Sequence, residues 1–448
     1  MEVFVVERIS AAVEKHRQLI LDAERYIWKN PETGYKEVKT SKYLAEKFEE
    51  LGYKLTFAEG ITGFYTVIDT GREGPEVLIL GELDSVICPA HPESDPVTGA
   101  VHACGHHAQS ATLLGIAAAL TEEGMLDSLC GRIRLCAVPA EELLEIEYRQ
   151  GLKAERRIKY LGGKSEFLSR GYFDGVDLAF MVHTANGFQV GSDHVGCIAK
   201  SIIYKGRAAH AGGNPSGGIN ALYAASCGLN AANSLRETFR EADMIRFHPI
   251  ITHGGDMVNA IPETAQIESY VRGASFEAIV RENKKINRAL IGAALSIGAN
   301  IEIVDMPGYS PLINDKEMKK VAAEAMKLID PETELPINVP WSTGSTDMGD
   351  LSCIMPVVHP YAAGAQGTSH GNNYYIVDPE AACVKNAKWQ LTMLTLLLQN
   401  GGERAKRIVE EYKPLFPSAK AFLEYQDSLN DEGDRITYKD GNEAVIRL

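Results

Sequence analysis

The sequence lacks long apolar runs and any excess of basic residues. No stretch of about 18 consecutive apolar residues occurs in its 448 residues, and no basic segment followed by an apolar one opens it. We therefore expect neither a membrane span nor an export signal, and we predict a cytoplasmic protein. Its 60 Asp and Glu residues outnumber its 45 Lys and Arg residues, for a formal net charge of -15. Because nucleic acids and anionic membranes are usually bound through a basic surface, we expect neither as a partner and favour a small-molecule substrate.

The sequence also lacks a disulfide framework and several familiar motifs. Its 8 cysteines are scattered, and most lie in apolar stretches typical of reduced core thiols. No internal repeat, phosphate-binding loop or Gly-x-Ser-x-Gly motif is present. With 45% hydrophobic residues, the chain can form one large or two ordinary domains, and we expect two.

One cysteine does lie among other potential ligands, in the stretch Val101–His107, which reads Val-His-Ala-Cys-Gly-His-His. A thiol and three imidazoles stand there, immediately before an apolar helix expected at 108–120. Cys104 and His106 are two residues apart, so a single turn can bring both to one metal ion, and Gly105 permits the tight backbone. We therefore predict a metal site; the alternative is a buried cysteine beside histidines that cap the helix.

Acidic and imidazole side chains follow three of the predicted strands. The strands are expected at 76–80, 133–138 and 173–182, and the side chains after them are Glu82 with Asp84, Glu141 with Glu142, and His183. Because α/β sheets place their sites at the carboxyl ends of strands, we expect these groups to converge with Cys104 and His106. Glu141 and Glu142 cannot point in one direction, so one can bind metal while the other acts as a general base. Solvated turns or an acid-rich helix start are the structural alternatives.

The predicted elements indicate two units, one inserted into the other. The first unit has helices at 5–29 and 38–51, strands at 54–57 and 63–69 beside those above, and, after residue 310, helices at 315–328 and 379–399 with a strand near 357. The second has a β-α-β-β-α-β order, with strands at 198–204, 256–259, 265–270 and 301–304 and helices at 218–239 and 275–295. We predict an α/β fold in which 1–195 and 306–448 form a mixed-sheet catalytic domain around an α+β insertion at 196–305. Residues 413–448 form an extension without a functional assignment.

Seven short motifs together resemble one protein family. They are Asn-Pro-Glu at 30–32, Gly-Glu-Leu-Asp at 81–84, His-Ala-Cys-Gly-His at 102–106, Pro-Ala-Glu-Glu at 139–142, Ala-Ala-His-Ala at 208–211, Asn-Ala-Ile-Pro at 259–262 and Gly-Ser-Thr-Asp at 344–347. With them the chain resembles the two-metal aminoacylase and carboxypeptidase superfamily of metallopeptidases. Within it, the chain is similar to the amidohydrolase branch of p-aminobenzoyl-glutamate and indole-acetyl-amino-acid hydrolases. The resemblance implies a phosphorylase/hydrolase-like catalytic domain with an inserted ferredoxin-like lid and dimerisation domain.

The resemblance also implies a metal centre. Its cofactor would be two divalent metal ions per subunit, Mn or Zn with Co or Ni possible, and the ligands would be Cys104, His106, Glu142, His183 and His370. Glu141 would be the general base. Asp84 would orient the imidazole of a ligand such as His106.

The inserted domain would supply further residues to the site. His210, reaching over from a partner subunit, would stabilise the tetrahedral oxyanion, and Asn259 and Arg272 would hold the substrate's carboxylate. We accordingly expect a homodimer, joined through an exposed edge strand near Met257 and Val258.

The implied activity is hydrolysis of the amide bond of N-acyl or N-aroyl amino acids. A dipeptidase or carboxypeptidase on the same scaffold, or a metal-binding relative without catalysis, are the alternatives. Two departures from the family pattern leave the acyl specificity open. His107 and Gln109 stand where relatives commonly have Asp or Asn and a further His, and the charged stretch 145–164 is longer than the usual connection.

Overall fold

The computed structural model describes residues 3–333, 335–439 and 443–448, and its first sheet has six strands in the order β1-β2-β6-β3-β7-β16. They are β1 (Thr56–Phe57), β2 (Phe64–Asp69), β3 (Glu76–Glu82), β6 (Arg132–Val138), β7 (Leu178–Phe180) and β16 (Val357–Val358). β3 lies parallel to β6 and β7, and β16 parallel to β7, whereas β2 runs antiparallel to β1 and β6. The predicted mixed α/β sheet is confirmed.

Helices cover both faces of this sheet. β3 is buried along its whole length, and its Val77 and Ile79 join one apolar cluster while Leu78 and Leu80 join another, because successive strand residues point to opposite faces. The first cluster includes α1 (Val3–Lys15), α2 (Arg17–Trp28), α3 (Val38–Glu50), α4 (His106–Leu120), α9 (Lys316–Ile329) and α11 (Asn386–Leu398). The second includes α6 (Gly163–Ser169), α10 (Met348–Ser352) and α13 (Ala419–Ser428).

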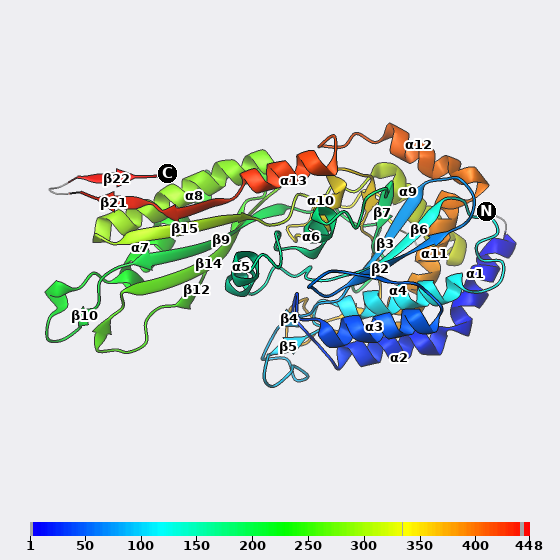
Figure 1. The fold of residues 1–448 in the computed structure, drawn as a ribbon, viewed down its shortest axis with the longest axis horizontal. Coiled ribbons are helices and arrows are strands. Elements are labelled where there is room, and N and C mark those ends of the chain that lie inside the picture. Colours follow the sequence, from blue (N-terminus) through cyan, green and yellow to red (C-terminus); the bar gives the residue numbers. More distant parts are fainter. Residues whose placement is uncertain (1–2, 334, 440–442) are drawn as a thin grey trace.

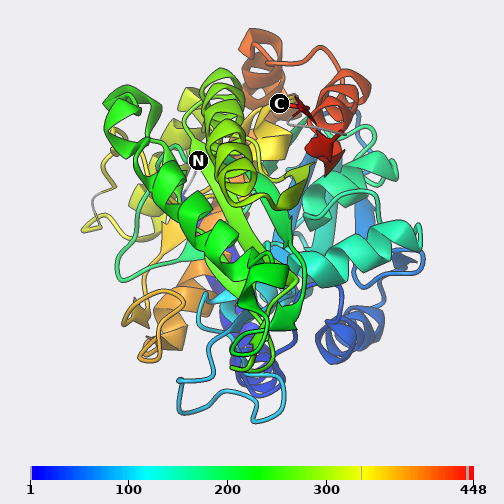
Figure 2. The same ribbon diagram turned by 90° about the vertical axis from the view of Figure 1, so that its left-hand side faces the viewer.

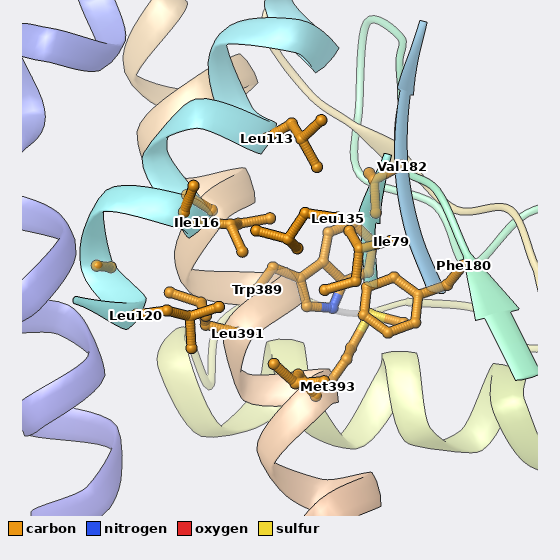
Figure 3. Close-up of a cluster of buried hydrophobic side chains, with 14 of the residues drawn as sticks. Ile79, Leu113, Ile116, Leu120, Leu135, Phe180, Val182, Trp389, Leu391 and Met393 are labelled. Carbon is orange, nitrogen blue, oxygen red and sulfur yellow. The ribbon is translucent and has the colours of Figure 1, made fainter. Parts of the chain in front are cut away.

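The first cluster fixes the position of α4, which begins at the candidate metal site. Figure 3 shows Trp389 of α11 packed among Ile79, Leu135 and Phe180, and its indole nitrogen donates to the Ala322 carbonyl at 2.8 Å. Every residue of α4 is buried, which agrees with its lack of a polar side. The first turn of α4 is therefore held by core packing on all sides.

A second sheet, which we call the inserted sheet, is built mainly from residues between β7 and β16. Its order is β11-β14-β9-β15-β20, and β12 also pairs with β14. The strands are β9 (Gly196–Lys205), β11 (Arg246–Phe247), β12 (Ile250–His253), β14 (Thr264–Gly273), β15 (Asn300–Pro307) and β20 (Asp431–Asp434). It lies at one end of an elongated molecule (Figure 1).

The two faces of the inserted sheet have different neighbours. α7 (Ala221–Asn233) and α8 (Phe276–Ile297) pack together over one face, where Ile202 and Tyr204 are buried (Figure 2). On the other face, Ser201 and Ile203 line a hollow beside α5 (Ile146–Ala154). α5 belongs to the charged stretch 145–164, and it lies between the two sheets (Figure 1).

Three predicted elements differ from the structure. The helix expected at 5–29 is interrupted at His16 and forms α1 and α2. The strand expected at 173–182 shortens to β7, because turns occupy 171–175. The strand expected at 256–259 is wrong: these residues form a turn before β13 (Ala260–Ile261), since Gly255, with φ 118°, reverses the chain.

The edge strand of the inserted sheet is therefore β12, not a segment at Met257 and Val258. Ile250 and Ile251 of β12 are 52% and 41% exposed. At the other edge, β20 pairs with β15. The prediction that 306–448 belongs to the catalytic domain is therefore wrong for residues 431–434, which join the inserted sheet. A hairpin of β21 (Ile436–Tyr438) and β22 (Ala444–Ile446) follows. Within the described ranges, no helix is both long and apolar enough to cross a membrane.

Candidate metal centre

The predicted ligands come from the carboxyl ends of neighbouring parallel strands and from the loops beside them. Glu82 ends β3, Glu141 and Glu142 follow β6, and His183 begins β8 (His183–Thr184), just after β7. Because β6, β3 and β7 are adjacent, these groups share one edge of the sheet. His370 arrives from a distant loop, and its backbone N–H donates to the Ala103 carbonyl at 2.8 Å.

The turn that carries Cys104 and His106 requires a glycine between them. Gly105 has φ 95°, and a Cβ atom on it would lie 2.1 Å from Thr184 Oγ1. This close approach packs the turn against β8 and so places Cys104 beside His183: Cys104 Sγ is 3.4 Å from His183 Nε2.

The five predicted ligands form two groups that share one thiol. Donor atoms of Cys104, His106 and His183 all lie within 4.8 Å of one another, and so do those of Cys104, Glu142 and His370. His106 Nε2 is buried and makes no hydrogen bond within the described part of the chain, with the Glu82 carboxylate 3.2 Å away, as expected of an imidazole nitrogen that serves a metal. Thiolate, imidazole and carboxylate together suit Zn or Mn, so the residues present would fit two divalent ions, with Cys104 common to both groups of donors.

Asp84 connects the two groups from behind. His106 Nδ1 donates to its carboxylate and to its backbone carbonyl, both at 3.0 Å, and the Glu142 backbone N–H donates to the second carboxylate oxygen at 2.8 Å. Asp84 thus selects the His106 tautomer whose Nε2 faces the candidate metal centre, and it fixes the backbone position of Glu142.

The two adjacent glutamates have opposite electrostatic surroundings. Burial, followed by the Glu82 and Glu142 carboxylates, raises the pKa of Glu141 well above its usual value. Burial also acts to raise the pKa of Glu142, but the His370 imidazole, with Nε2 2.9 Å from Glu142 Oε1, outweighs it together with His106 and Cys104 and lowers that pKa to about 2. Burial and Glu142 oppose ionisation of Cys104 as well, yet His106 and His183 lower its pKa to about 6. Such separation is typical of sites in which one carboxyl binds and the other carries protons.

A buried cation that the sequence did not single out lies beneath the centre. Lys164 Nζ is 2.6 Å from Glu82 Oε1 and also pairs with Asp347, from the loop that carries the Gly-Ser-Thr-Asp motif. Gln109 donates to Glu82 Oε2 at 2.9 Å, and that oxygen is 3.2 Å from His106 Nε2. Glu82 is therefore a third acid beside the ligands, with Glu141 and Glu142, and the Lys164 ammonium compensates its charge.

Two residues that depart from the family pattern, His107 and Gln109, each have a carboxylate neighbour. Gln109 bonds to Glu82 as just described, and His107 Nε2 lies 3.2 Å from Glu24 Oε1 on α2. Each of these two residues is thus matched by an acid elsewhere in the chain.

The long connection after Glu142 contributes a second missed residue, Arg149. Its guanidinium is buried, donates to the carbonyl oxygens of Glu142 and Leu161, the latter at 2.7 Å, and lies over the Tyr35 ring. No carboxylate accepts from it among the described residues. Arg149 thus holds the backbone at Glu142 from inside the protein.

The ligands open into a cavity of about 690 Å³ between the two sheets. Arg272 of β14 lines this cavity and donates to Ser345 Oγ at 3.2 Å. Among the described lining residues, Arg272 is the one Lys or Arg, and Glu141 and Glu142 are the only carboxylates. Apart from the predicted ligands, the remaining described wall has no carboxylate, lysine or arginine and includes Tyr309, Ser342 and Thr346.

Two predicted site residues lie elsewhere. His210 is in β10 (Ala209–His210), which pairs with β13, and the Asn259 carbonyl accepts from Ala211 N at 2.9 Å. Both side chains are exposed, outside the cavity of their own chain and at the far end of the inserted sheet, where β10 is labelled in Figure 1.

Comparison with known proteins identifies the family. The model described as peptidase family M20/M25/M40 matches residues 78–395. Xaa-Arg dipeptidase from Mus musculus is 28% identical over 381 residues, covering 82% of this chain and 81% of the relative. A solved dinuclear metal-binding peptidase of the M20 family from Bacillus subtilis has a TM-score of 0.61 at 21% identity, covering 86% of this chain and 99% of the other. An aminobenzoyl-glutamate utilization protein from Klebsiella pneumoniae has a TM-score of 0.66 at 17% identity, covering 88% and 99%. The chain therefore belongs to peptidase family M20/M25/M40 and is a hydrolase.

Proposed function

We propose that this hydrolase is a metal-dependent amidohydrolase that releases an amino acid from N-acyl or N-aroyl amino acids. The observation that supports this most is the set of charged side chains that line the cavity. Its described lining offers Arg272 for one free carboxylate, and no acid other than Glu141 and Glu142 for a free amine. An amino acid blocked at its nitrogen matches that set, because a buried ion needs an opposite charge.

In this proposal Cys104, His106, Glu142, His183 and His370 hold two divalent metal ions, Mn or Zn with Co or Ni as further possibilities. When bound, the ions supply Lewis acidity to the attacking water and to the amide carbonyl. Glu141, whose pKa is raised, takes a proton from that water and delivers it to the leaving amine nitrogen. Arg272 holds the substrate's carboxylate through its two-pronged guanidinium.

His210 and Asn259 would act from a second copy of the chain. They lie together at the tip of the inserted sheet, away from their own cavity, and a homodimer joined along β12 would let this tip reach the partner's site. His210 would then stabilise the oxyanion of the tetrahedral intermediate, and Asn259 would help to hold the carboxylate. Residues 196–305 thus serve as lid and dimerisation domain.

The rival activity is a dipeptidase, the activity named for the relative from Mus musculus. A dipeptidase must hold the ammonium group of its substrate, and an Arg-specific one a guanidinium as well. The described cavity wall has no acid to spare for either.

Two substrates with the same amide bond to L-methionine distinguish the two activities. N-acetyl-L-methionine and glycyl-L-methionine differ only by the free amine, so we expect the holoenzyme to prefer the acetyl compound by about 10²-fold in kcat/KM, the scale of an unpaired buried charge. Preference for the dipeptide would establish the dipeptidase instead. Exhaustive chelation should abolish turnover, and full activity after chelation would exclude metal-dependent hydrolysis.

A further inference from the structure

One wall of the cavity carries a hydrogen-bonding group that the proposed chemistry does not use. His359 directly follows β16, so it lies at the same sheet edge as the ligands, and it is 1% exposed. Its backbone N–H donates to Asn314 Oδ1 at 2.7 Å, which fixes its position. The imidazole lines the cavity and meets the His183 ring edge-on, with centroids 5.8 Å apart.

The hydrogen bonds of His359 fix what it presents to a substrate. Its Nδ1 lies 2.9 Å from the Met181 carbonyl oxygen, which can only accept, so Nδ1 carries the hydrogen. In the neutral ring Nε2 is then a bare acceptor, and no hydrogen bond to it occurs among the described residues. A buried acceptor on a cavity wall is satisfied by a donor on the ligand.

His194 and Tyr361 line the same wall of the cavity as His359 and lie close to each other. His194 Nε2 and the Tyr361 hydroxyl are 3.1 Å apart, and their rings are stacked at 19°. His194 is 5% exposed. Among the described lining residues, this wall has neither a lysine or arginine for a second carboxylate nor an acid for an amine.

The shared loop places this wall beside Arg272. His194 bridges to Ser342, and Arg272 donates to Ser345 three residues along the same loop. Arg272 and His359 thus line one cavity and are connected through this loop, so a substrate held at Arg272 shares the cavity with His359.

Building on the proposed function, we propose that His359, with His194 and Tyr361 beside it, forms a subsite for a neutral hydrogen-bond donor on the amino acid's side chain. The matching groups are a carboxamide or a hydroxyl. The class of substrate is then an N-acyl amino acid with one carboxylate and a neutral polar side chain, rather than an acidic one.

Three isosteric substrates test this subsite: N-acetyl-L-glutamine, N-acetyl-L-glutamate and N-acetyl-L-methionine. For the holoenzyme we expect kcat/KM for the glutamine compound to exceed that for the methionine compound by about tenfold, the scale of one neutral hydrogen bond. It should exceed that for the glutamate compound by about a hundredfold, because a second carboxylate has no cation to pair with. Equal or faster hydrolysis of the glutamate compound would overturn the proposal.

Two variants assign the preference to His359. His359→Leu should bring the glutamine-to-methionine ratio to about one, whereas His359→Gln, whose amide oxygen can accept near the position of Nε2, should restore part of it. A purely structural role would lower both rates together, so an unchanged ratio in His359→Leu would refute the assignment. Failure of the proposed function looks different, since then none of these substrates nor other N-acyl amino acids would be hydrolysed by wild type.

Discussion

Glu141 and Glu142 are the same residue type, but their neighbours shift their pKa values in opposite directions. They are adjacent in the chain and equally buried, yet His370 lies beside one, while two carboxylates lie beside the other. A carboxyl group with a raised pKa suits proton transfer, and one with a lowered pKa suits metal binding.

This division predicts the behaviour of Glu141→Gln. The amide keeps the side chain's shape but cannot take up a proton, so we expect turnover to fall by about 10²–10⁴-fold, the usual contribution of general acid–base catalysis. Metal content should remain near two ions per chain. Glu147→Gln, at an exposed position on α5, is the matched control and should keep wild-type turnover. Both are checked by elemental analysis and steady-state kinetics; retention of most activity in Glu141→Gln would contradict the assignment.

At the scale of elements, the C-terminal segment ties the two sheets together. α13 packs beside α6 under the first sheet, and β20 then pairs with β15 of the inserted sheet. Arg435 is buried, donates to the Ile303 carbonyl at 3.0 Å and pairs with Asp431 at 2.9 Å. The segment therefore spans the junction and restrains the inserted sheet relative to the cavity (Figure 1).

Ile436 is the apolar anchor of this segment. It is 1% exposed and lies in the cluster of Ile301 and Ile303, so Ile436→Ala should destabilise the inserted sheet by about 2–4 kcal/mol through lost burial and a cavity. Val445→Ala in the same hairpin, where Val445 is 51% exposed, should change stability by less than about 0.5 kcal/mol. Denaturant unfolding of both variants gives the comparison. Equal stability of the two would show that the segment is not anchored there.

At the scale of the whole molecule, the cavity takes walls from both sheets, but one chain leaves part of the predicted site outside it. Arg272 reaches the cavity from β14, whereas His210 and Asn259 remain at the distal tip of the same sheet. In the proposed function, a second copy of the chain brings His210 to the site as the oxyanion donor.

Complementation between two inactive variants tests the shared site. His210→Ala alone should lose about 10²–10³-fold in turnover, the scale for one oxyanion donor. Mixing it with Glu141→Gln should recover activity, because one site of each mixed dimer combines an intact Glu141 with an intact His210. Subunit exchange is confirmed separately with labelled chains. If exchange occurs without recovery, His210 does not act across subunits.

The sequence by itself determined the parts of this protein that depend on local spacing. Cys104 and His106 stand on one turn, adjacent Glu141 and Glu142 diverge, and buried strands deliver side chains to one edge, so the mixed α/β sheet and the convergence of these side chains were predictable. The complete ligand set, with His370, came from the family resemblance and stays a prediction. The strand expected at 256–259 was not, because its apolar pattern is overruled by the reversal at Gly255.

Only the tertiary structure decided which distant groups meet. Lys164 and Asp347 are 183 residues apart, and His359 contacts Met181 across 178, and neither pairing has a local signal. β20 joins β15 more than a hundred residues away for the same reason. Such contacts follow from strand order and core packing, which depend on the whole chain at once, whereas ligand type and spacing are properties of a few neighbouring residues.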